Sequence, residues 1–379
     1  MTRHDYKQSA YYLIYLIRCV LNNKTPSKEK LDNIDLAQLY LVAKAHSLNA
    51  ITAYALESVG IYDKIFEEEK NKAIRKNILL DFERERILSE LENAGIWYMP
   101  LKGIILKDYY PQIGMRQMCD NDILFDKSLV DDVKRIMTGL DFEMKHDDSG
   151  HDLEFVKAPV CNFEMHTALF GAGYGASMNP YYDNVFSRLL KDDNNQFGYH
   201  FSNEDFYIFM QAHEYKHFYM GGTGLRSLLD VFVFLSKFND CLNWDYINKE
   251  LSDLGIYDYE QGSKNLSIKL FSGIKLSSAE KDQLDYYIFS GTYGTKENMI
   301  KNTLNKNGGG VYAKILYFID RLFVPLRKSN PKYNAYKKQY PLFYKHPVIL
   351  PFLPFFRLIH IAIKGRKRLS YELKSLIKL

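Results

Sequence analysis

Helical spacing of apolar residues dominates the first part of the chain. Four apolar positions near the start fall on one helical face: Leu13, Leu16, Ile17 and Val20. The same spacing follows Asp35, and a longer helix is expected over residues 74–94. The buried stripe of that longer helix is expected to comprise Ile78, Phe82, Leu88 and Leu91. We therefore expect residues 1–74 to form an N-terminal helical region.

The period of the pattern changes after Gly95, which occupies an expected C-cap position. Short apolar runs that are typical of strands cover residues 96–101, 119–125, 151–156 and 161–169. Ala158–Pro159, between the last two runs, suggests a hairpin connection. Short helices are expected over residues 104–110 and 129–137. Residues 75–195 are therefore predicted to form a mixed α+β core with a small sheet.

Helical spacing returns at about residue 203. Helices are expected over residues 205–219 and 225–238, with a glycine-rich break between them. Arg226 and Asp230, four residues apart on the second of these helices, are expected to form an ion pair. Residues 196–330 are assigned to a helical domain, and residues 331–379 to a proline-containing basic tail. The predicted fold class is α+β, a small mixed β-sheet core flanked by N-terminal helices and a C-terminal helical domain.

The charge balance and the cysteines narrow the classes of function. The 379 residues include 50 Lys and Arg against 46 Asp and Glu, a small excess that does not by itself indicate a nucleic-acid partner. The four cysteines are widely spaced, which disfavours a disulfide framework or a thiolate zinc site and fits a reducing compartment. The N-terminal segment lacks the pattern of a secretory signal, and no apolar run reaches spanning length. We expect a cytoplasmic protein.

Two aspartates alternate in the predicted strand over residues 119–125. Asp120 and Asp122 are two residues apart, so their side chains would lie on the same face. Adjacent carboxylates repel each other unless a cation neutralises them, and Mg²⁺ prefers oxygen ligands together with substrate phosphates. Glu164 lies in another predicted strand and could supply a third carboxylate. The pattern favours a two-metal site, although an Asp-x-Asp pair alone also occurs in turns and at strand edges.

A lysine–glycine turn precedes these aspartates. Lys102 and Gly103 lie at the predicted strand-to-helix junction, where glycine lets the backbone approach a phosphate closely. The N-terminus of the following helix offers free N–H groups, and Lys102 adds positive charge. An ordinary turn is the alternative interpretation. In the context of the aspartates, the turn indicates a phosphate-binding site.

The segment LKGIILKDYYPQIGMRQMCDNDILFD resembles the signature of an uncharacterised nucleotidyltransferase family, which belongs to the DNA polymerase beta-like superfamily. The matching positions are Leu101, Lys102, Gly103, Tyr110, Pro111, Arg116, Asp120 and Asp122. Further along, NFEMH, AHEYKH and GLRSLLDVFVFL match later motifs that contain Glu164, His166, His213, His217 and Asp230. The wider superfamily usually has serine or glycine where this chain has Ile104.

The resemblance implies an enzyme that moves a nucleoside monophosphate from a nucleoside triphosphate, with ATP expected, to an unidentified acceptor. Pyrophosphate would be released, and Mg²⁺ or Mn²⁺ would be the cofactor. The implied catalytic and metal-binding residues are Asp120, Asp122 and Glu164. The implied nucleotide-binding residues are Lys102, Gly103, Arg116, His166, His213 and His217. A solvated loop position for Arg116 and a structural role for His166 stay open. No stable nucleic-acid partner is expected.

Two other functions are considered. The chain could be a nucleotide-binding module that keeps the fold without turnover. His213, Glu214 and His217 also match H-E-x-x-H on a predicted helix, which is the zinc motif of metalloproteases. Zinc would need a third protein ligand, and Met220 and Thr223 stand where the extended metzincin pattern requires glycine and histidine. The metalloprotease is therefore the less favoured alternative.

The C-terminal segment combines apolar and basic residues. Residues 348–356 are strongly apolar, and a basic cluster follows at residues 364–368. A weak contact with a membrane surface or a lipid carrier is one interpretation. A packed segment with a solvated basic end is the favoured one, because Pro351 and Pro354 oppose a continuous inserted helix.

Overall fold

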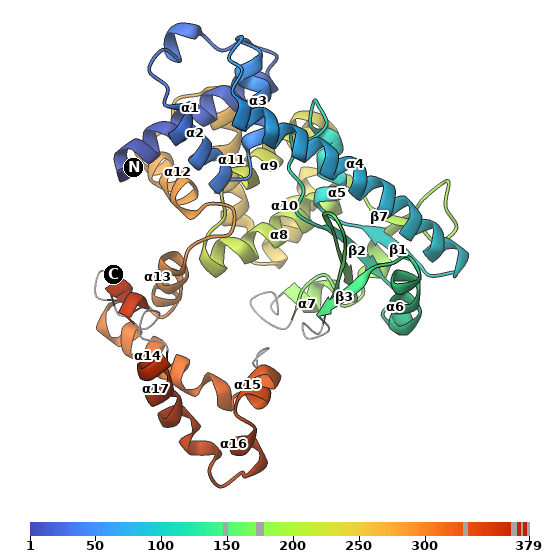
Figure 1. Ribbon diagram of the computed structural model, residues 1–379, viewed down its shortest axis with the longest axis vertical. Coiled ribbons are helices and arrows are strands. Elements are labelled where there is room, and N and C mark those ends of the chain that lie inside the picture. Colours follow the sequence, from blue (N-terminus) through green and yellow to red (C-terminus); the bar gives the residue numbers. More distant parts are fainter. Residues whose placement is uncertain (147–150, 172–177, 329–332, 365–369, 373, 377–379) are drawn as a thin grey trace.

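A computed structural model describes residues 1–379 except 147–150, 172–177, 329–332, 365–369, 373 and 377–379 (Figure 1). Its N-terminal helices are α1 (Arg3–Leu21), α2 (Leu36–Ala45), α3 (Asn49–Glu57) and α4 (Lys64–Asn93). As predicted, Leu13, Leu16 and Ile17 of α1 are buried. Asp35 caps α2, because its carboxylate accepts a hydrogen bond from the backbone N–H of Gln38. The helices predicted for this region are therefore present.

The chain then forms a five-stranded mixed sheet. Its strands are β1 (Tyr98–Pro100), β2 (Asn121–Phe125), β3 (Glu143–His146), β4 (Asp152–Lys157) and β5 (Cys161–His166). The order across the sheet is β1-β2-β5-β4-β3, in which β2 and β5 run parallel and the other neighbouring pairs run antiparallel. The hairpin predicted around Ala158–Pro159 joins β4 to β5. β3 was not predicted, because its residues EMKH are mostly polar.

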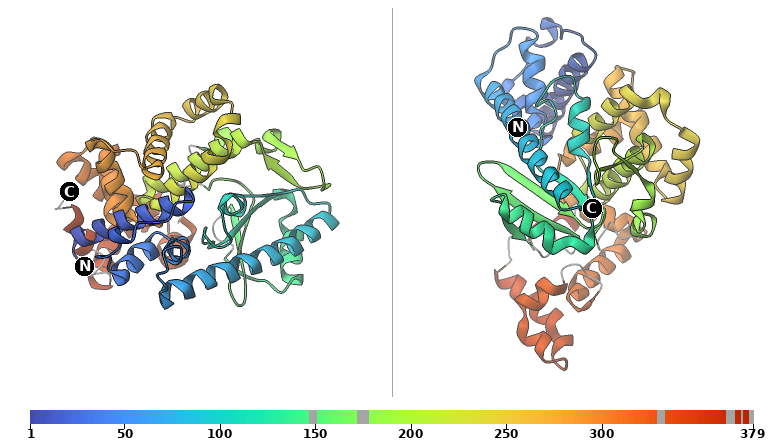
Figure 2. Two further views of the ribbon diagram at one scale, coloured as in Figure 1. Left: turned by 90° about the horizontal axis from the view of Figure 1, so that it is seen from above. Right: turned by 90° about the vertical axis from the view of Figure 1, so that its right-hand side faces the viewer.

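Helices cover both faces of this sheet (Figure 2). On one face, α4 and α6 (Val130–Gly139) share a core with the strand residues Ile123, Phe125, Phe163 and Met165. On the other face, Leu124 belongs to a core with α8 (Asn203–Gly221) and α9 (Leu225–Phe238). Because side chains alternate along a strand, Asp122 and Glu164 lie on the face that α8 covers. The sheet thus separates a largely apolar side, which also buries Asn121, from the side that carries the carboxylates.

The buried face of α4 matches the predicted one only in part. The expected burial of Ile78 and Phe82 is wrong, since these residues are 53% and 56% exposed. Leu91 is buried as predicted, and Leu88 is partly buried. Leu80 and Ile87 are buried in place of the other two, where α4 packs against α6 and β5. Apolar residues occur on more than one side of this helix, so its sequence alone left the buried face ambiguous. Contact with the sheet buries only one narrow row of the apolar side chains of α4.

The remaining elements complete a largely helical surround. Short elements near the sheet are α5 (Gly103–Leu106), α7 (Asn179–Tyr182), β6 (Leu189–Lys191) and β7 (Tyr199–Phe201). The later helices are α10 (Trp244–Asp253), α11 (Tyr257–Ser272), α12 (Ser278–Ser290), α13 (Lys296–Lys306), α14 (Gly310–Phe323), α15 (Tyr333–Gln339), α16 (Pro341–Lys345) and α17 (Leu353–Lys364). Together with the mixed sheet, they confirm the predicted α+β fold class.

Helices from distant parts of the chain share one core. Residues of α1, α2 and α3 pack with residues of α9, α11 and α12 in a single hydrophobic cluster. Residues 331–379, predicted as a tail, contain the helices α15 to α17, and most of the predicted basic cluster at residues 364–368 lies outside the described residues. Among the described helices, none is both long and apolar enough to cross a membrane.

Candidate active site on the sheet face beneath α8

Asp122 and Glu164 are neighbours in the sheet although they are far apart in the sequence. The register of β2 and β5 pairs Asp122 with Glu164 and Leu124 with His166. Paired positions point to the same face, and residues two apart on one strand share that face. The register therefore brings Asp122, Glu164 and His166 together.

These three side chains form a group of potential metal ligands. One ligand atom from each lies within 4.8 Å of the others, and no further group of this kind occurs among the described residues. His166 Nε2 lies 3.0 Å from Asp122 Oδ1 and 3.6 Å from Glu164 Oε2. Asp120, half-buried and directly before β2, is not in this group, although alternation places it on the same side. His166, predicted to bind nucleotide, thus lies among the candidate metal ligands.

The three carboxylates affect one another's ionisation. Burial, followed by the charges of Asp122 and Asp120, raises the pKa of Glu164 to about 8. Burial and the charge of Asp122 also raise the pKa of Asp120. Burial opposes ionisation of Asp122 too, but the charge of Lys102 and the hydrogen bond with His166 outweigh it and hold the pKa of Asp122 well below its usual range. Two of the three carboxylates therefore resist a negative charge unless a cation lies beside them.

This donor set fits a divalent cation. Carboxylate oxygens are the ligands that Mg²⁺ and Mn²⁺ prefer, and they crowd together here on one face of the sheet. The imidazole of His166 can either bind the cation directly or hold Asp122 in position through the hydrogen bond. A bound cation would relieve the repulsion that raises the pKa of Glu164.

The Lys102–Gly103 turn lies beside the carboxylates. Lys102 has a φ of 43°, a region that disfavours side chains, and its ammonium nitrogen lies 3.6 Å from Asp122 Oδ2. Non-glycine residues in such conformations cost free energy and are often found at functional sites. α5, which follows, has only four residues, so the helix-dipole contribution expected from the sequence is small. The positive charge of Lys102 is therefore the main electrostatic contribution of this turn.

Arg116 holds the turn against α9. Its guanidinium forms a two-point ion pair with Asp230, with Nε at 2.8 Å from Oδ1 and Nη2 at 2.9 Å from Oδ2. The hydroxyl of Tyr110 donates a further hydrogen bond to Asp230 at 2.7 Å. Arg116 is thus not a solvated loop residue, and Asp230 is paired with Arg116 rather than with Arg226 as predicted. A Cβ atom on Gly103 would lie 2.6 Å from Arg116 Nη1, which explains glycine at that position.

His213 and His217 lie one turn apart on α8, and their Nε2 atoms are 3.1 Å apart. Burial, the charge of Lys102 and the neighbouring His217 lower the pKa of His213 well below its usual range. Burial and the charges of Lys216 and Lys102 lower the pKa of His217 to about 3. Both imidazoles are therefore neutral at physiological pH, and both are close enough to Lys102 to respond to its charge.

The zinc-protease alternative gains no support from this geometry. Among the described residues, no third histidine, cysteine or carboxylate joins His213 and His217 as a ligand. Glu214, the expected catalytic base, accepts a hydrogen bond from the hydroxyl of Thr223 at 3.0 Å. A zinc site needs at least three protein ligands, so the H-E-x-x-H match is incomplete as a metal site.

Two cationic residues near the carboxylates were not predicted as site residues. Burial and the charge of Lys102 lower the pKa of Lys216, on α8, to about 8. The charges of Asp122 and Glu164 act in the opposite direction and raise this pKa. The charge of Arg226, at the start of α9, acts on Asp120. Lys216 is three residues from His213 and could have been found by helical spacing. The spacing of Arg226 in the sequence indicates only a partner for Asp230.

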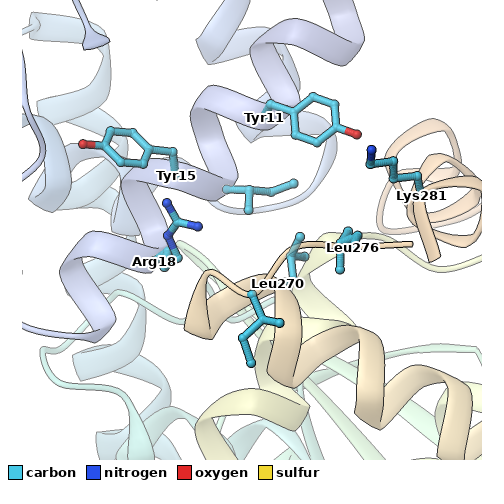
Figure 3. A pocket seen from close by; sticks show the side chains of 8 residues that line it. Tyr11, Tyr15, Arg18, Leu270, Leu276 and Lys281 are labelled. Carbon is cyan, nitrogen blue, oxygen red and sulfur yellow. The ribbon is translucent and has the colours of Figure 1, made fainter. Parts of the chain in front are cut away.

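A separate pocket lies between α1 and the connection from α11 to α12 (Figure 3). Its lining includes Tyr11, Tyr15, Arg18, Leu270, Leu276 and Lys281. None of the predicted site residues lines it. The pocket is therefore distinct from the carboxylate site.

The fold and the site together define a protein with a sheet-borne carboxylate cluster of the kind that binds divalent cations. Over residues 32–262, which are more than half of the chain, the sequence matches the model of a family described as uncharacterised nucleotidyltransferase, and the chain belongs to this family. The match covers every predicted site residue but does not extend to the wider DNA polymerase beta-like superfamily. Neither the curated proteins nor the solved structures contain a match to the chain.

Proposed function

We propose that the protein transfers a nucleoside monophosphate from a nucleoside triphosphate, with ATP as the expected donor, to an acceptor that is not yet identified. In this reaction an acceptor oxygen forms a bond to the α-phosphorus, and the bond from that phosphorus to the bridging oxygen breaks. Pyrophosphate leaves, and the acceptor loses its proton. The family match supports the class of reaction, and the site geometry supports the residues.

The observation that carries this proposal is the placement of Asp122 and Glu164 side by side with Lys102 next to them. A triphosphate needs a cation to shield its negative charge, and the carboxylates would hold that cation. When bound, a divalent cation would neutralise the phosphate charge and favour departure of pyrophosphate. Asp122, Glu164 and His166 are the residues closest together, and Asp120 would complete the set of ligands.

The residues around the carboxylates would have different roles in the reaction. Lys102, Lys216 and Arg226 would bind phosphate oxygens, since all three have charges that act on the carboxylate group. Glu164 would accept the proton of the acceptor. Arg116 would position the Lys102–Gly103 turn through its ion pair with Asp230. The neutral His213 and His217 would line the side of the site formed by α8.

A nucleotide-binding module without turnover is the second candidate. It would use the same carboxylates and the same lysine, so binding alone does not separate the two functions. Turnover does separate them.

The test is transfer of label from each of four α-³²P nucleoside triphosphates, with Mg²⁺ or Mn²⁺, in the presence of an extract that contains candidate acceptors. The proposal expects labelled product and released pyrophosphate from at least one triphosphate. Both should be lost in Asp122→Asn and kept in Glu143→Gln, which changes an exposed carboxylate on the edge strand β3. Metal-dependent triphosphate binding without either product would instead favour the binding module.

A further inference from the structure

The positive charge of the chain is concentrated at its C-terminal end. Residues 310–379 contain 15 lysines and arginines against two acidic residues, Asp320 and Glu372. The preceding 309 residues contain 35 basic and 44 acidic residues, so that part is net negative. A strong asymmetry of this kind indicates a partner of opposite charge for the basic part.

α17 and the turn before it expose an apolar stripe within this basic region. Phe352, Phe355, Phe356 and Ile359 are 62%, 57%, 47% and 61% exposed. Their spacing of three, four and seven residues places them on one helical side. Leu353 is fully buried and anchors the start of α17. Exposed apolar side chains that lie side by side are a common feature of contact surfaces.

α14 has a second exposed apolar stripe. Val311, Tyr312, Ile315 and Ile319 are 73%, 69%, 52% and 47% exposed. The buried side of the same helix carries Ala313 and Tyr317, which pack with α13 residues. α14 and α17 are tied together, because the guanidinium of Arg357 donates hydrogen bonds to the backbone carbonyls of Arg321 and Leu322. Both stripes therefore belong to one packed unit.

This unit lies apart from the sheet and its carboxylates. In Figures 1 and 2, α14 to α17 extend away from the sheet and from α8. Exposed lysines, among them Lys328, Lys337 and Lys345, belong to the same unit. The region thus presents apolar and cationic side chains together, at a distance from the proposed reaction.

We propose that the unit formed by α14 to α17 binds the surface of an anionic lipid bilayer. The exposed phenylalanine and isoleucine side chains of α17 would enter the boundary between headgroups and acyl chains, and the lysines would contact anionic headgroups. This inference does not depend on the proposed nucleotidyl transfer.

Charge and chemistry favour a bilayer over other partners. A second copy of the chain on this surface would bring two strongly basic regions together, which opposes association. A nucleic acid would match the charge but would leave the exposed valine and isoleucine side chains without apolar partners. An anionic bilayer matches both features.

The test is flotation of the 379-residue chain with vesicles of phosphatidylcholine alone or of phosphatidylcholine mixed with phosphatidylglycerol. We expect binding to the mixed vesicles, weaker binding at high salt and little binding to the neutral vesicles. The variant Phe355→Glu with Ile359→Glu should reduce affinity for mixed vesicles by at least about tenfold, because two inserted apolar side chains are lost. The matched control is Ile78→Glu with Phe82→Glu on α4, which changes the same residue types and the same net charge at exposed helical positions. This control should bind like the unchanged protein.

Equal binding of both double variants to mixed vesicles would overturn the proposal. So would an absence of binding to mixed vesicles by the unchanged protein. Light scattering of the same samples without lipid detects the competing outcome, a dimer that only the α17 variant disrupts, which would assign the stripe to self-association instead.

Discussion

Asp122 and Glu164 occupy directly paired positions of the parallel strands β2 and β5, and both carboxylates point to the side covered by α8. The pair is held in a partly desolvated place, where Lys102 is 3.6 Å from one carboxylate and His166 bridges toward both. Repulsion between such carboxylates is an unfavourable term in the free protein. A divalent cation attracts both carboxylates, and this attraction outweighs their mutual repulsion. Several measurable consequences follow.

Divalent cations should stabilise the folded protein. Ligand binding to the native state alone adds about 2.7 kcal/mol when its concentration is a hundred times its Kd. We expect Tm to rise with MgCl₂ or MnCl₂ in thermal denaturation, and the rise to vanish in Asp122→Asn and in Glu164→Gln. Glu143→Gln, at an exposed position of the edge strand β3, should keep it. A rise that is unchanged in both site variants would place the cation elsewhere.

Removing Arg116 should destabilise the protein. Arg116→Ala would leave the buried Asp230 carboxylate without its ion pair, and breaking a buried pair in this way costs about 3–5 kcal/mol. Chemical denaturation measures this loss in the free energy of unfolding. Arg226→Ala, which removes a guanidinium from the same helix as Asp230, should cost less than about 1 kcal/mol. Equal losses in both variants would show that the Arg116–Asp230 pair has no special role.

A methyl group at position 103 should disturb the turn. In Gly103→Ala the Cβ atom would meet Arg116 Nη1 at 2.6 Å and the methyl carbon of Met118 at 3.1 Å. Overpacking of this kind typically costs about 1–3 kcal/mol, and displacement of Arg116 would also weaken nucleotide binding. Gly139→Ala at the end of α6 is the control, because nothing lies within 4 Å of its Cβ position. Denaturation and calorimetric titration with triphosphate check both effects, and a Gly103→Ala protein of unchanged stability would contradict the packing described.

His46 should make stability depend on pH. It is fully buried, it accepts a hydrogen bond from the backbone N–H of Leu225 at 3.1 Å, and burial lowers its pKa to about 4. The unfolded chain binds a proton near pH 6.5 and the folded chain only near pH 4, so stability falls as the pH decreases through this window. The total loss from this group is on the order of 3 kcal/mol.

A comparison of the unchanged protein with His46→Asn isolates the contribution of His46 to the pH dependence of stability. Asparagine can keep the acceptor but does not titrate, so the variant should lose less stability than the unchanged protein between pH 6.5 and pH 4. The difference is measured by urea denaturation at each pH. Parallel curves for the two proteins would mean that His46 is not the group responsible.

The sequence predicted local elements better than the contacts between them. α9 spans Leu225–Phe238 as expected, because its apolar spacing is regular and a glycine-rich break precedes it. The strands that carry Asp122 and Glu164 were also found, since both are short apolar runs. Their parallel pairing was not predictable, because a one-residue shift in register would separate the two carboxylates.

Contacts that join distant segments were missed for the same reason. The ion pair between Arg116 and Asp230 joins residues far apart in the chain, whereas helical spacing favours the local partner Arg226. The buried face of α4 is set by the apolar residues that contact the sheet, and the sequence of the helix alone does not identify them. Apart from its helical spacing from His213, Lys216 has no distinctive sequence signal of its own, and only the packing of α8 over the sheet brings it near the carboxylates.

The central claim is that Asp122 and Glu164 jointly hold the cation on which nucleotidyl transfer depends. The most direct measurement is the rate of label transfer from the accepted α-³²P triphosphate in Asp122→Asn, in Glu164→Gln and in the variant with both changes. Loss of several kcal/mol of charge stabilisation corresponds to about a thousandfold in rate. We predict such a loss in each single variant, little further loss in the double variant, and normal folding in all three by circular dichroism. Rates in the double variant that stay within about tenfold of the unchanged protein would contradict the account.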